Sequence, residues 1–234
     1  MLLLGLDLET TGLDPNKDLV IEVGAVLWDT EANQPVRLFS EMILEKPDLA
    51  LPKEIEELTG IRTQMLHRFG KAPDDLFFSA LGSLLEQADG CVAHNAAFDK
   101  GFLTRFYSRW GRELPEKTWI CTLLDVDYPK SVSSKSLVYL SAVHGFVNPF
   151  AHRAVTDVLS MFRVLSHYKI EEVWANASSP KLELVALVSY ENRQQAKDLG
   201  FRWDGSSKKW KKQIRAHLFD PKALPFEVEK TLVP

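Results

Sequence analysis

LLLGLDLETTG, residues 2–12, is the stretch from which the fold of this chain can be predicted. Side chains alternate between the two faces of an extended strand, so the leucines at 2, 4, 6 and 8 share one face and residues 3, 5, 7 and 9 share the other. The stretch is apolar on both faces until its carboxyl end, which is typical of a central strand of a sheet. Asp7 and Glu9 therefore point the same way at the end of this strand.

Two carboxylates in that position raise each other's pKa unless a cation lies between them. Hard, anionic oxygen ligands suit Mg²⁺ or Mn²⁺. We therefore expect a divalent-metal site at the end of the first strand, completed by ligands from later in the chain.

The chain has 234 residues, enough for one large domain or for a domain with a small appendage. Its two cysteines, Cys91 and Cys121, are far apart and lack the histidine spacing of a zinc knuckle, so a reducing cytoplasm is the expected setting. The apolar run at the start has no basic lead-in and soon reaches Asp7, so we expect neither a signal peptide nor a membrane span.

The order of hydrophobic patterns and breakers predicts a mixed α/β sheet with helices on both faces. After the first strand we expect strands at 19–28 and 36–44, a helix at 53–58, a helix from Asp74 or Asp75 to 87, a strand at 91–94, a helix at 97–110, a strand at 119–122 and helices at 136–144 and 153–168. The first three strands form an antiparallel meander, and the later strands alternate with helices as parallel strands do.

Composition divides the chain into a main domain at 1–174, a linker at 175–181 and a small module at 182–234. The module is expected to be βαββ, with a strand at 182–190, a helix at 191–199 and a hairpin turning at 204–207. From Pro180 onward there are 11 Lys+Arg against 7 Asp+Glu, whereas the remainder has 17 against 25. The acidic body argues against tight non-specific binding of nucleic acid on its own, and the basic module could compensate.

Further candidate metal ligands occur at two places. Asp99 lies in the first helical turn after the expected strand at 91–94, where its carboxylate can reach a cation above the sheet. His152 and Asp157 are five residues apart, about 140° around a helix. If both serve one site, His152 must lie before the helix or in its frayed first turn, with Asp157 inside the helix.

Four carboxylates and one histidine fit two divalent ions roughly 3.5–4 Å apart, the arrangement used for in-line displacement at a phosphodiester. An imidazole can take the proton of the attacking water near neutral pH, because its unperturbed pKa is about 6.5. Each residue alone has a plainer interpretation: Asp7 as a strand-end surface residue, Asp99 as a helix cap, Asp157 as an ion-pair partner and His152 as a surface histidine. Their occurrence together favours a metal site.

The blocks DLETTG (7–12), HNAAFD (94–99) and HRAVTD (152–157) resemble the three exonuclease motifs of DEDD 3′–5′ exonucleases. The histidine five residues before the last aspartate resembles the His-type branch (DEDDh), which includes bacterial DNA polymerase III epsilon proofreading subunits and the exonuclease X type. The segments VIEVGAV (20–26) and LTGI (58–61) are also similar to the family. Thr59 stands where the family commonly has histidine, a departure that concerns substrate detail and no metal ligand.

The resemblance implies an RNase H-like fold in which Asp7, Glu9, Asp99 and Asp157 hold two Mg²⁺ or Mn²⁺ and His152 is the general base. It also implies a set of substrate contacts: Thr10, Thr11, Gly12, Leu13, Asn95, Phe98 and Phe102. Phe98 and Phe102 fit a core position as well, and Asn95 could contact the phosphate or brace its loop, as we expect of His94.

The function so implied is hydrolysis of DNA, preferentially at single-stranded or frayed 3′ ends, to nucleoside 5′-monophosphates. The alternatives are an exoribonuclease of the same family and a catalytically silent RNase H-like scaffold that recruits partners. Nucleic acid is the expected partner, and a replication or repair protein could bind the C-terminal module. In that module, lysines around Trp210 could contact nucleic acid, whereas Trp203 and Trp210 are expected to pack against the helix. DNA or RNA preference, pathway and oligomeric state stay open.

Overall fold

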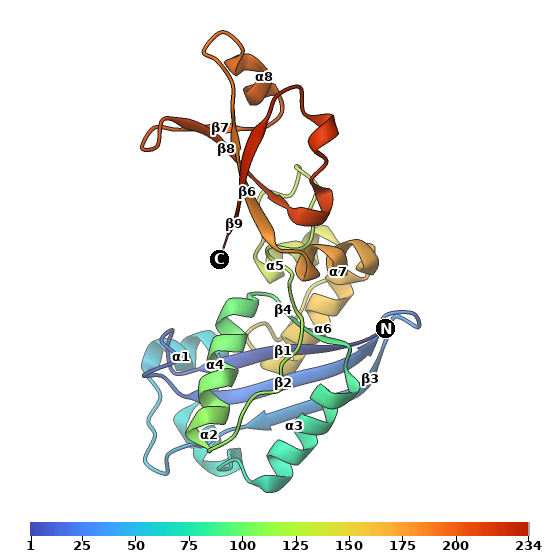
Figure 1. The fold of residues 1–234 in the computed structure, drawn as a ribbon. Helices are drawn as coiled ribbons and strands as arrows, with labels where there is room; N and C mark the ends of the chain where they lie inside the picture. The colour runs from blue at the N-terminus through green and yellow to red at the C-terminus, as the bar shows by residue number, and fades with distance from the viewer. Residues whose placement is uncertain (234) are drawn as a thin grey trace. The chain divides into compact units, whose positions relative to one another are not determined.

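The computed structural model describes residues 1–233 and divides the chain into two compact units, Met1–Trp174 and Ala175–Pro234. The first unit contains a five-stranded sheet in the order β3-β2-β1-β4-β5 (Figure 1). Its strands are β1 (Leu2–Thr10), β2 (Val20–Asp29), β3 (Gln34–Met42), β4 (Gly90–Ala93) and β5 (Trp119–Cys121). β1, β2 and β3 pair antiparallel, whereas β4 and β5 run parallel to β1, which confirms the predicted mixed sheet.

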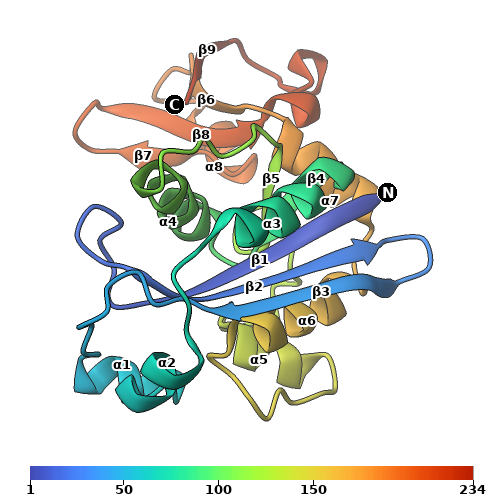
Figure 2. The same ribbon diagram turned by 90° about the horizontal axis from the view of Figure 1, so that it is seen from below.

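Helices cover both faces of this sheet. The first unit contains α1 (Lys53–Thr59), α2 (Thr63–Phe69), α3 (Asp75–Gln87), α4 (Ala96–Arg109), α5 (Leu137–Val143) and α6 (Ala154–Leu165), and α7 (Ile170–Ser178) runs through the unit boundary. Figure 2 shows α3 and α4 on one side of β1–β3 and α5 and α6 on the other. Asp74 caps α3, its carboxylate accepting from the Phe77 N–H at 2.8 Å, as expected of one of the two candidate aspartates.

The alternation read from residues 2–12 sets the two faces of β1. Leu4, Leu6 and Leu8 belong to the main core cluster, together with Phe102 and Phe106 of α4. On the opposite face, a Cβ atom added to Gly5 would lie 2.4 Å from the ring of Phe162 in α6. Gly5 therefore allows α6 to lie directly against β1, and the carboxyl end of β1 remains the polar part of this face.

The C-terminal unit contains a four-stranded sheet in the order β7-β8-β6-β9. Its elements are β6 (Lys181–Ala186), α8 (Arg193–Asp198), β7 (Arg202–Asp204), β8 (Lys209–Arg215), the 3-10 helices η1 (Ala216–Leu218) and η2 (Pro221–Ala223), and β9 (Val228–Leu232). The expected βαββ order is present, and β9 adds a fourth strand by pairing antiparallel with β6. Leu184, Ala196 and Phe201 form the centre of a separate core.

The structure differs from the sequence-based expectation at residues 175–181. This segment was expected to be a linker, but α7 continues to Ser178 and β6 begins at Lys181. Alanine is the best helix former, so Ala175 and Ala177 allow the helix to continue, and Pro180 follows its end. Helix α2 was also missed. Among the described residues, no helix is long and apolar enough to cross a membrane.

Candidate active site

Two of the proposed metal ligands lie at the carboxyl end of β1. Asp7 is half-buried and pairs with Gly24 of the neighbouring strand β2, whereas Glu9 is 9% exposed and pairs with Glu22. The pairing with β2 shifts between Glu9 and Thr10, as at a β-bulge. Such irregularities bend a strand and redirect its side chains, and here the shift separates the two acidic positions from the turn that follows.

The start of α6 brings two more candidates to the same place. His152 lies before the helix with φ of 62°, and Asp157 lies in its first turn, as the five-residue spacing predicted. The His152 backbone N–H donates to Asp157 Oδ2 at 2.9 Å. One ligand atom from each of Glu9, His152 and Asp157 lies within 4.8 Å of the other two.

Glycine at position 24 allows α6 to approach β2 this closely. A Cβ atom there would lie 2.3 Å from the Val155 nitrogen and 2.4 Å from the Ala154 carbonyl carbon. The first turn of α6 is also held by Glu22, which accepts from the Ala154 N–H at 2.9 Å and pairs with Arg153 at 2.7 Å. The position of Asp157 relative to β1 therefore depends on two residues of β2.

Asp99 approaches from the other face of the sheet, in the first turn of α4. It is 3% exposed, and its Oδ1 accepts from the Leu8 N–H at 3.2 Å. Asp99 lies near enough to Asp7 that its negative charge adds to the effect of burial in raising the pKa of Asp7. Asp7, His152 and Asp157 line one cavity of about 350 Å³, together with His94 and Asn148.

Burial and mutual repulsion make these carboxyl groups unusual. Burial first, then the charge of Asp99 and the other acids, raises the pKa of Asp7 well above its ordinary value. Burial and the charge of Glu22 raise the pKa of Glu9 to about 8, and burial raises that of Asp99 to about 7. The pKa of Asp157 is also raised, mainly by burial. Clustered buried carboxyls that hold their protons this tightly are a donor set suited to hard divalent cations, which would stabilise their charged forms.

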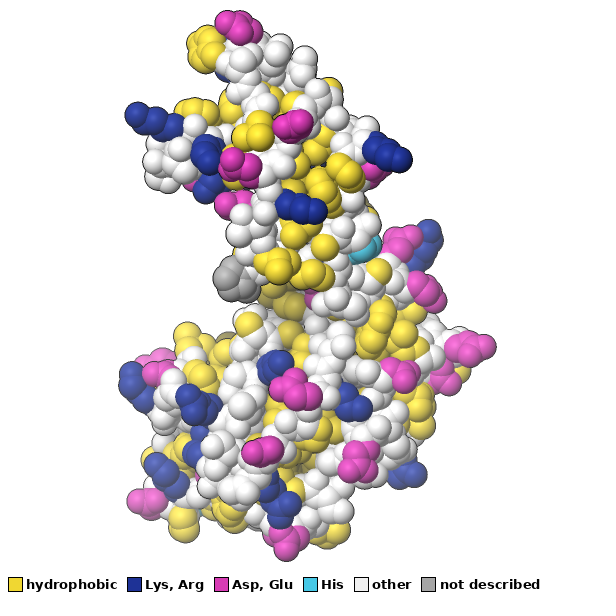
Figure 3. Space-filling model, viewed as in Figure 1, with side chains coloured by type: hydrophobic (Ala, Val, Ile, Leu, Met, Phe, Trp, Pro, Cys, Tyr) yellow, Lys and Arg dark blue, Asp and Glu magenta, His cyan; other side chains and the backbone are white. Residues whose placement is uncertain are grey.

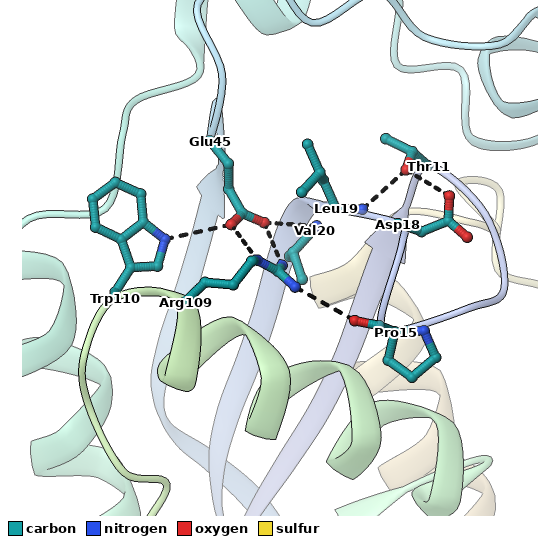
Figure 4. Close-up of polar contacts among 8 residues, drawn as sticks. All are labelled: Thr11, Pro15, Asp18, Leu19, Val20, Glu45, Arg109 and Trp110. Atoms are coloured by element: carbon teal, nitrogen blue, oxygen red, sulfur yellow. Dashed lines mark hydrogen bonds and ion pairs between the residues drawn. The ribbon is translucent and has the colours of Figure 1, made fainter.

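The turn after β1 is fixed to the rest of the unit by a buried carboxylate (Figure 4). Glu45 accepts from Arg109 Nε at 2.8 Å and Nη2 at 2.6 Å, and from the Val20 N–H at 3.1 Å. Arg109 Nη1 also donates to the Pro15 carbonyl at 3.5 Å. The last turn of α4 therefore restrains the middle of the segment that joins β1 to β2, at Pro15, and holds its β2 end through Glu45.

The expected substrate-contacting residues of this turn have different surroundings. Thr10 Oγ1 donates to the Gly12 carbonyl at 2.6 Å, and Thr11 Oγ1 donates to Asp18 at 3.1 Å while accepting from the Leu19 N–H at 3.0 Å. Leu13 is 84% exposed. The threonines thus shape the turn and leave Leu13 free to contact another molecule.

The aromatic candidates in α4 are placed differently from the expectation. Phe102 is fully buried in the main core and cannot contact a substrate there, which corrects its assignment as a substrate contact. Phe98 is partly buried, with its ring centroid 4.7 Å from that of Phe102. Asn95 is exposed at the start of α4 and makes no capping hydrogen bond. His94 braces its loop, since its ring contacts the Thr122 hydroxyl and the Lys135 carbonyl, both at 2.8 Å.

Several residues that position the site were missed from the sequence. Glu22 could have been noticed as a charge inside the apolar run VIEVGAV. Asn148, whose Nδ2 donates to Asp157 Oδ1 at 2.7 Å, precedes a proline in an irregular loop and gives no such signal. Glu45 and Arg109 are 64 residues apart, and only the fold brings them together.

Comparison with known proteins places the chain in a family. Residues 4–165 match the RNase_T model, described as "Exonuclease", and residues 182–231 match DUF8626, a domain of unknown function. The first match covers more than half of the chain, so the chain belongs to the exonuclease family, and its fold and three motifs are of the DEDDh 3′–5′ type.

Relatives match the chain over only part of their length. The 3′-5′ exonuclease DinG of Staphylococcus saprophyticus is 32% identical over 163 residues, which is 68% of this chain and 17% of the relative. DNA polymerase III subunit epsilon of Treponema pallidum is 37% identical over 100 residues, 42% of each chain. The chain thus spans well under two thirds of these relatives.

Solved structures share the fold. Exonuclease I superposes with a TM-score of 0.64 at 17% identity, covering 79% of this chain and 48% of that one. The nuclease domain of 3′hExo, described as a DEDDh family member bound to rAMP, has a TM-score of 0.56 at 16% identity, covering 71% and 90%. At these identities the likeness concerns the RNase H-like architecture.

Proposed function

We propose that this protein is a 3′–5′ exonuclease that hydrolyses DNA, preferentially at single-stranded or frayed 3′ ends, and releases nucleoside 5′-monophosphates. The observation that carries the proposal is the convergence of Glu9, His152 and Asp157, whose ligand atoms lie within 4.8 Å of one another. Asp7, His152 and Asp157 also line one cavity, and the charge of buried Asp99 acts on Asp7. Repulsion among buried like charges costs stability, so a catalytically silent scaffold would have no reason to keep these acids together.

We assign Asp7, Glu9, Asp99 and Asp157 to hold two divalent cations, Mg²⁺ or Mn²⁺. Such ions lower the pKa of a nearby water and neutralise charge that develops on the scissile phosphate. Two of the four carboxylates already have a defined orientation: Asp157 accepts from the His152 N–H and from Asn148, and Asp99 accepts from the Leu8 N–H. Fixed ligands of this kind need little rearrangement when charge develops.

We assign His152 as the general base. Its side chain is exposed, and one ring nitrogen lies within 4.8 Å of ligand atoms of Glu9 and Asp157. An imidazole in this place can accept the proton of the attacking water and pass it to solvent. The left-handed backbone at His152, unusual for a residue other than glycine, directs the chain into α6 directly after the imidazole.

We assign the turn after β1 to bind the 3′-terminal nucleotide. Leu13 offers an apolar surface for its base, while Thr10, Thr11 and Gly12 shape the backbone around its sugar and phosphate. Asn95 and the partly buried Phe98 contribute from the start of α4. The three motifs contain no residue assigned to reading a 2′-hydroxyl, so an exoribonuclease is the second candidate.

The relatives support both polymers. Exonuclease I has been described in complex with single-stranded DNA, whereas a related 3′-exonuclease has been described as recognising a histone mRNA stem-loop. The DNA polymerase III relatives favour DNA for this chain, and they also motivate a replication or repair protein as a partner of the C-terminal unit. Two buried free cysteines fit the proposed reducing cytoplasm.

The test is a direct assay of polymer and direction. Purified protein with Mg²⁺ or Mn²⁺ is given DNA and RNA strands carrying a label at either the 5′ or the 3′ end. We expect the 3′ label on DNA to appear at once as a mononucleotide, while the 5′-labelled strand shortens stepwise. Faster degradation of RNA would select the second candidate, and no metal-dependent shortening of either polymer would refute the enzymatic function.

A further inference from the structure

The C-terminal unit contains a groove of about 510 Å³, a size typical of ligand sites. One side is formed by the segment from Val185 to Tyr190 and by Arg193 at the start of α8. The other is formed by Trp203 of β7, Trp210 of β8 and the lysines of the hairpin between them. All of these residues belong to the unit itself and none to the exonuclease site.

Two aromatic side chains of the groove are far more exposed than folding requires. Trp203 is 54% exposed and Tyr190 is 76% exposed, and neither belongs to the core cluster of the unit. Trp210 does pack against that core, and its ring centroid lies 5.7 Å from that of Trp203. The expectation that both tryptophans pack against α8 is therefore wrong for Trp203, which presents a flat apolar surface supported from behind by Trp210.

Positive charge surrounds these rings. The guanidinium carbon of Arg193 lies 3.7 Å from the centre of the Tyr190 ring. Lys208 makes no ion pair with any described residue, and Lys209 pairs with Glu229 at 3.2 Å in an exposed contact of the kind that stabilises little. Of the described residues that line the groove, three are basic and none is acidic.

The hairpin that carries the lysines is held in shape before any ligand arrives. Asp204 Oδ1 accepts from the Ser206 N–H at 3.0 Å and from its hydroxyl at 2.6 Å, and Oδ2 accepts from the Ser207 hydroxyl at 2.7 Å. Lys208 has φ of 52°, so the chain reverses there. Figure 3 shows hydrophobic side chains interspersed with Lys, Arg, Asp and Glu side chains on one face of this unit.

We propose that this groove binds single-stranded nucleic acid, with bases stacked on Trp203 and Tyr190 and phosphates beside Arg193, Lys208 and Lys209. Exposed aromatic rings with cations at their edges match a polymer of flat bases joined by anionic phosphates. A duplex hides the faces of its bases, and an ordinary peptide brings no counter-charge for Arg193 and Lys208, for which no ion pair is found among the described residues. The unit carries 11 Lys+Arg against 7 Asp+Glu, so its field also favours a polyanion.

The assay measures binding of a closed circular single-stranded DNA to the full chain in EDTA. A circle has no 3′ end and EDTA removes divalent ions, so the exonuclease site contributes neither end recognition nor hydrolysis. A failure of the proposed exonuclease function would therefore leave this test intact. Affinity is followed by the fluorescence anisotropy of a small circle that carries an internal fluorophore, over a series of salt concentrations.

We expect Trp203→Ala to weaken binding by roughly 5- to 150-fold, the loss found when one stacking aromatic is removed, and Trp203→Phe to restore most of it. Lys208→Glu should weaken binding and lower the salt slope by about 0.7, the value for one phosphate contact on a single strand. Lys222→Glu changes the net charge of the unit equally but lies outside the groove, so it is the matched control. Leu218→Ala, at an apolar residue 55% exposed outside the groove, is the control for lost surface area.

Equal binding by Trp203→Ala and Leu218→Ala would overturn the proposal and leave the groove to another occupant, such as an acidic peptide. Equal salt slopes for Lys208→Glu and Lys222→Glu would also overturn the proposal, because Lys208 would then contribute only to the general attraction between the basic unit and the DNA. Far-ultraviolet circular dichroism and thermal unfolding of each variant check the fold. Because Lys208 is exposed in a turn, its variant keeps the test decisive even where Trp203→Ala unfolds the unit.

Discussion

Replacing Gly24 with alanine adds one methyl group where the backbone of α6 crosses β2. The new Cβ atom would lie 2.3 Å from the Val155 nitrogen, whereas ordinary van der Waals contact begins at 3.4 Å. The opposing atoms are backbone, so no side chain can rotate away, and the start of α6 must move by about 1 Å. His152 and Asp157 must move with it, away from Glu9.

We expect two effects of Gly24→Ala that can be measured separately. The free energy of unfolding in urea should fall by about 1–3 kcal/mol, the usual cost of overpacking. The rate of release of the 3′-terminal nucleotide should fall about 100-fold, because a 1 Å misplacement of reacting groups costs that much.

Gly82→Ala is the matched control. Gly82 lies in α3, and a Cβ atom added there meets nothing within 4 Å. This variant should be about 0.5–1 kcal/mol more stable than the wild type, because alanine is the better helix former, and its activity should not change. If Gly24→Ala behaves like Gly82→Ala in both measurements, the inference that β2 positions the start of α6 is wrong.

Three further predictions concern the groups around the site. Glu22→Ala leaves Arg153 without its partner, so the free energy of unfolding in urea should fall by on the order of 3 kcal/mol. An unchanged free energy of unfolding would contradict a structural role for the pair. Arg109→Ala frees the turn after β1, so KM for a single-stranded oligonucleotide should rise several-fold with kcat nearly constant, whereas a fall in kcat alone would count against it. Without metal, the folded state binds protons on Glu9, with pKa raised from 4.5 to about 8, more tightly than the unfolded state does. The contribution of Glu9 to the free energy of unfolding is therefore complete below about pH 4.5 and is lost as the pH rises to about 8. Tm in EDTA should fall through this window, and Mn²⁺ should restore Tm at its upper end. A Tm that does not change with pH would contradict the burial of these acids.

The sequence predicts those parts of the site that depend on local spacing. Alternation along residues 2–9 places Asp7 and Glu9 on one face of β1. The five-residue interval places His152 before the helix of Asp157 or in its first turn, and the structure has it before the helix. Main-domain elements with strong periodicity were also located to within a few residues, since their hydrophobic faces pack where the pattern indicates.

What the sequence does not predict depends on contacts between distant segments. Phe102 has the same residue type as Phe98 and lies one helical turn away, and only packing decides that Phe102 is fully buried. The end of helix α7 was assigned to a linker because its small residues, at 175–178, fit either a linker or a helix. The exposure of Trp203 likewise depends on how β7 lies beside β8.

We claim that Asp7 belongs to a metal-dependent hydrolytic site, and one rate measurement tests this. Release of the 3′-terminal nucleotide from single-stranded DNA is compared for the wild type, Asp7→Asn and Glu41→Gln, an exposed carboxylate of β3, at saturating Mn²⁺. Partners that merely orient metal ligands cost about 10–100-fold when removed, so loss of a ligand should cost at least about 100-fold, while Glu41→Gln should match the wild type. Equal rates for Asp7→Asn and the wild type would contradict the claim.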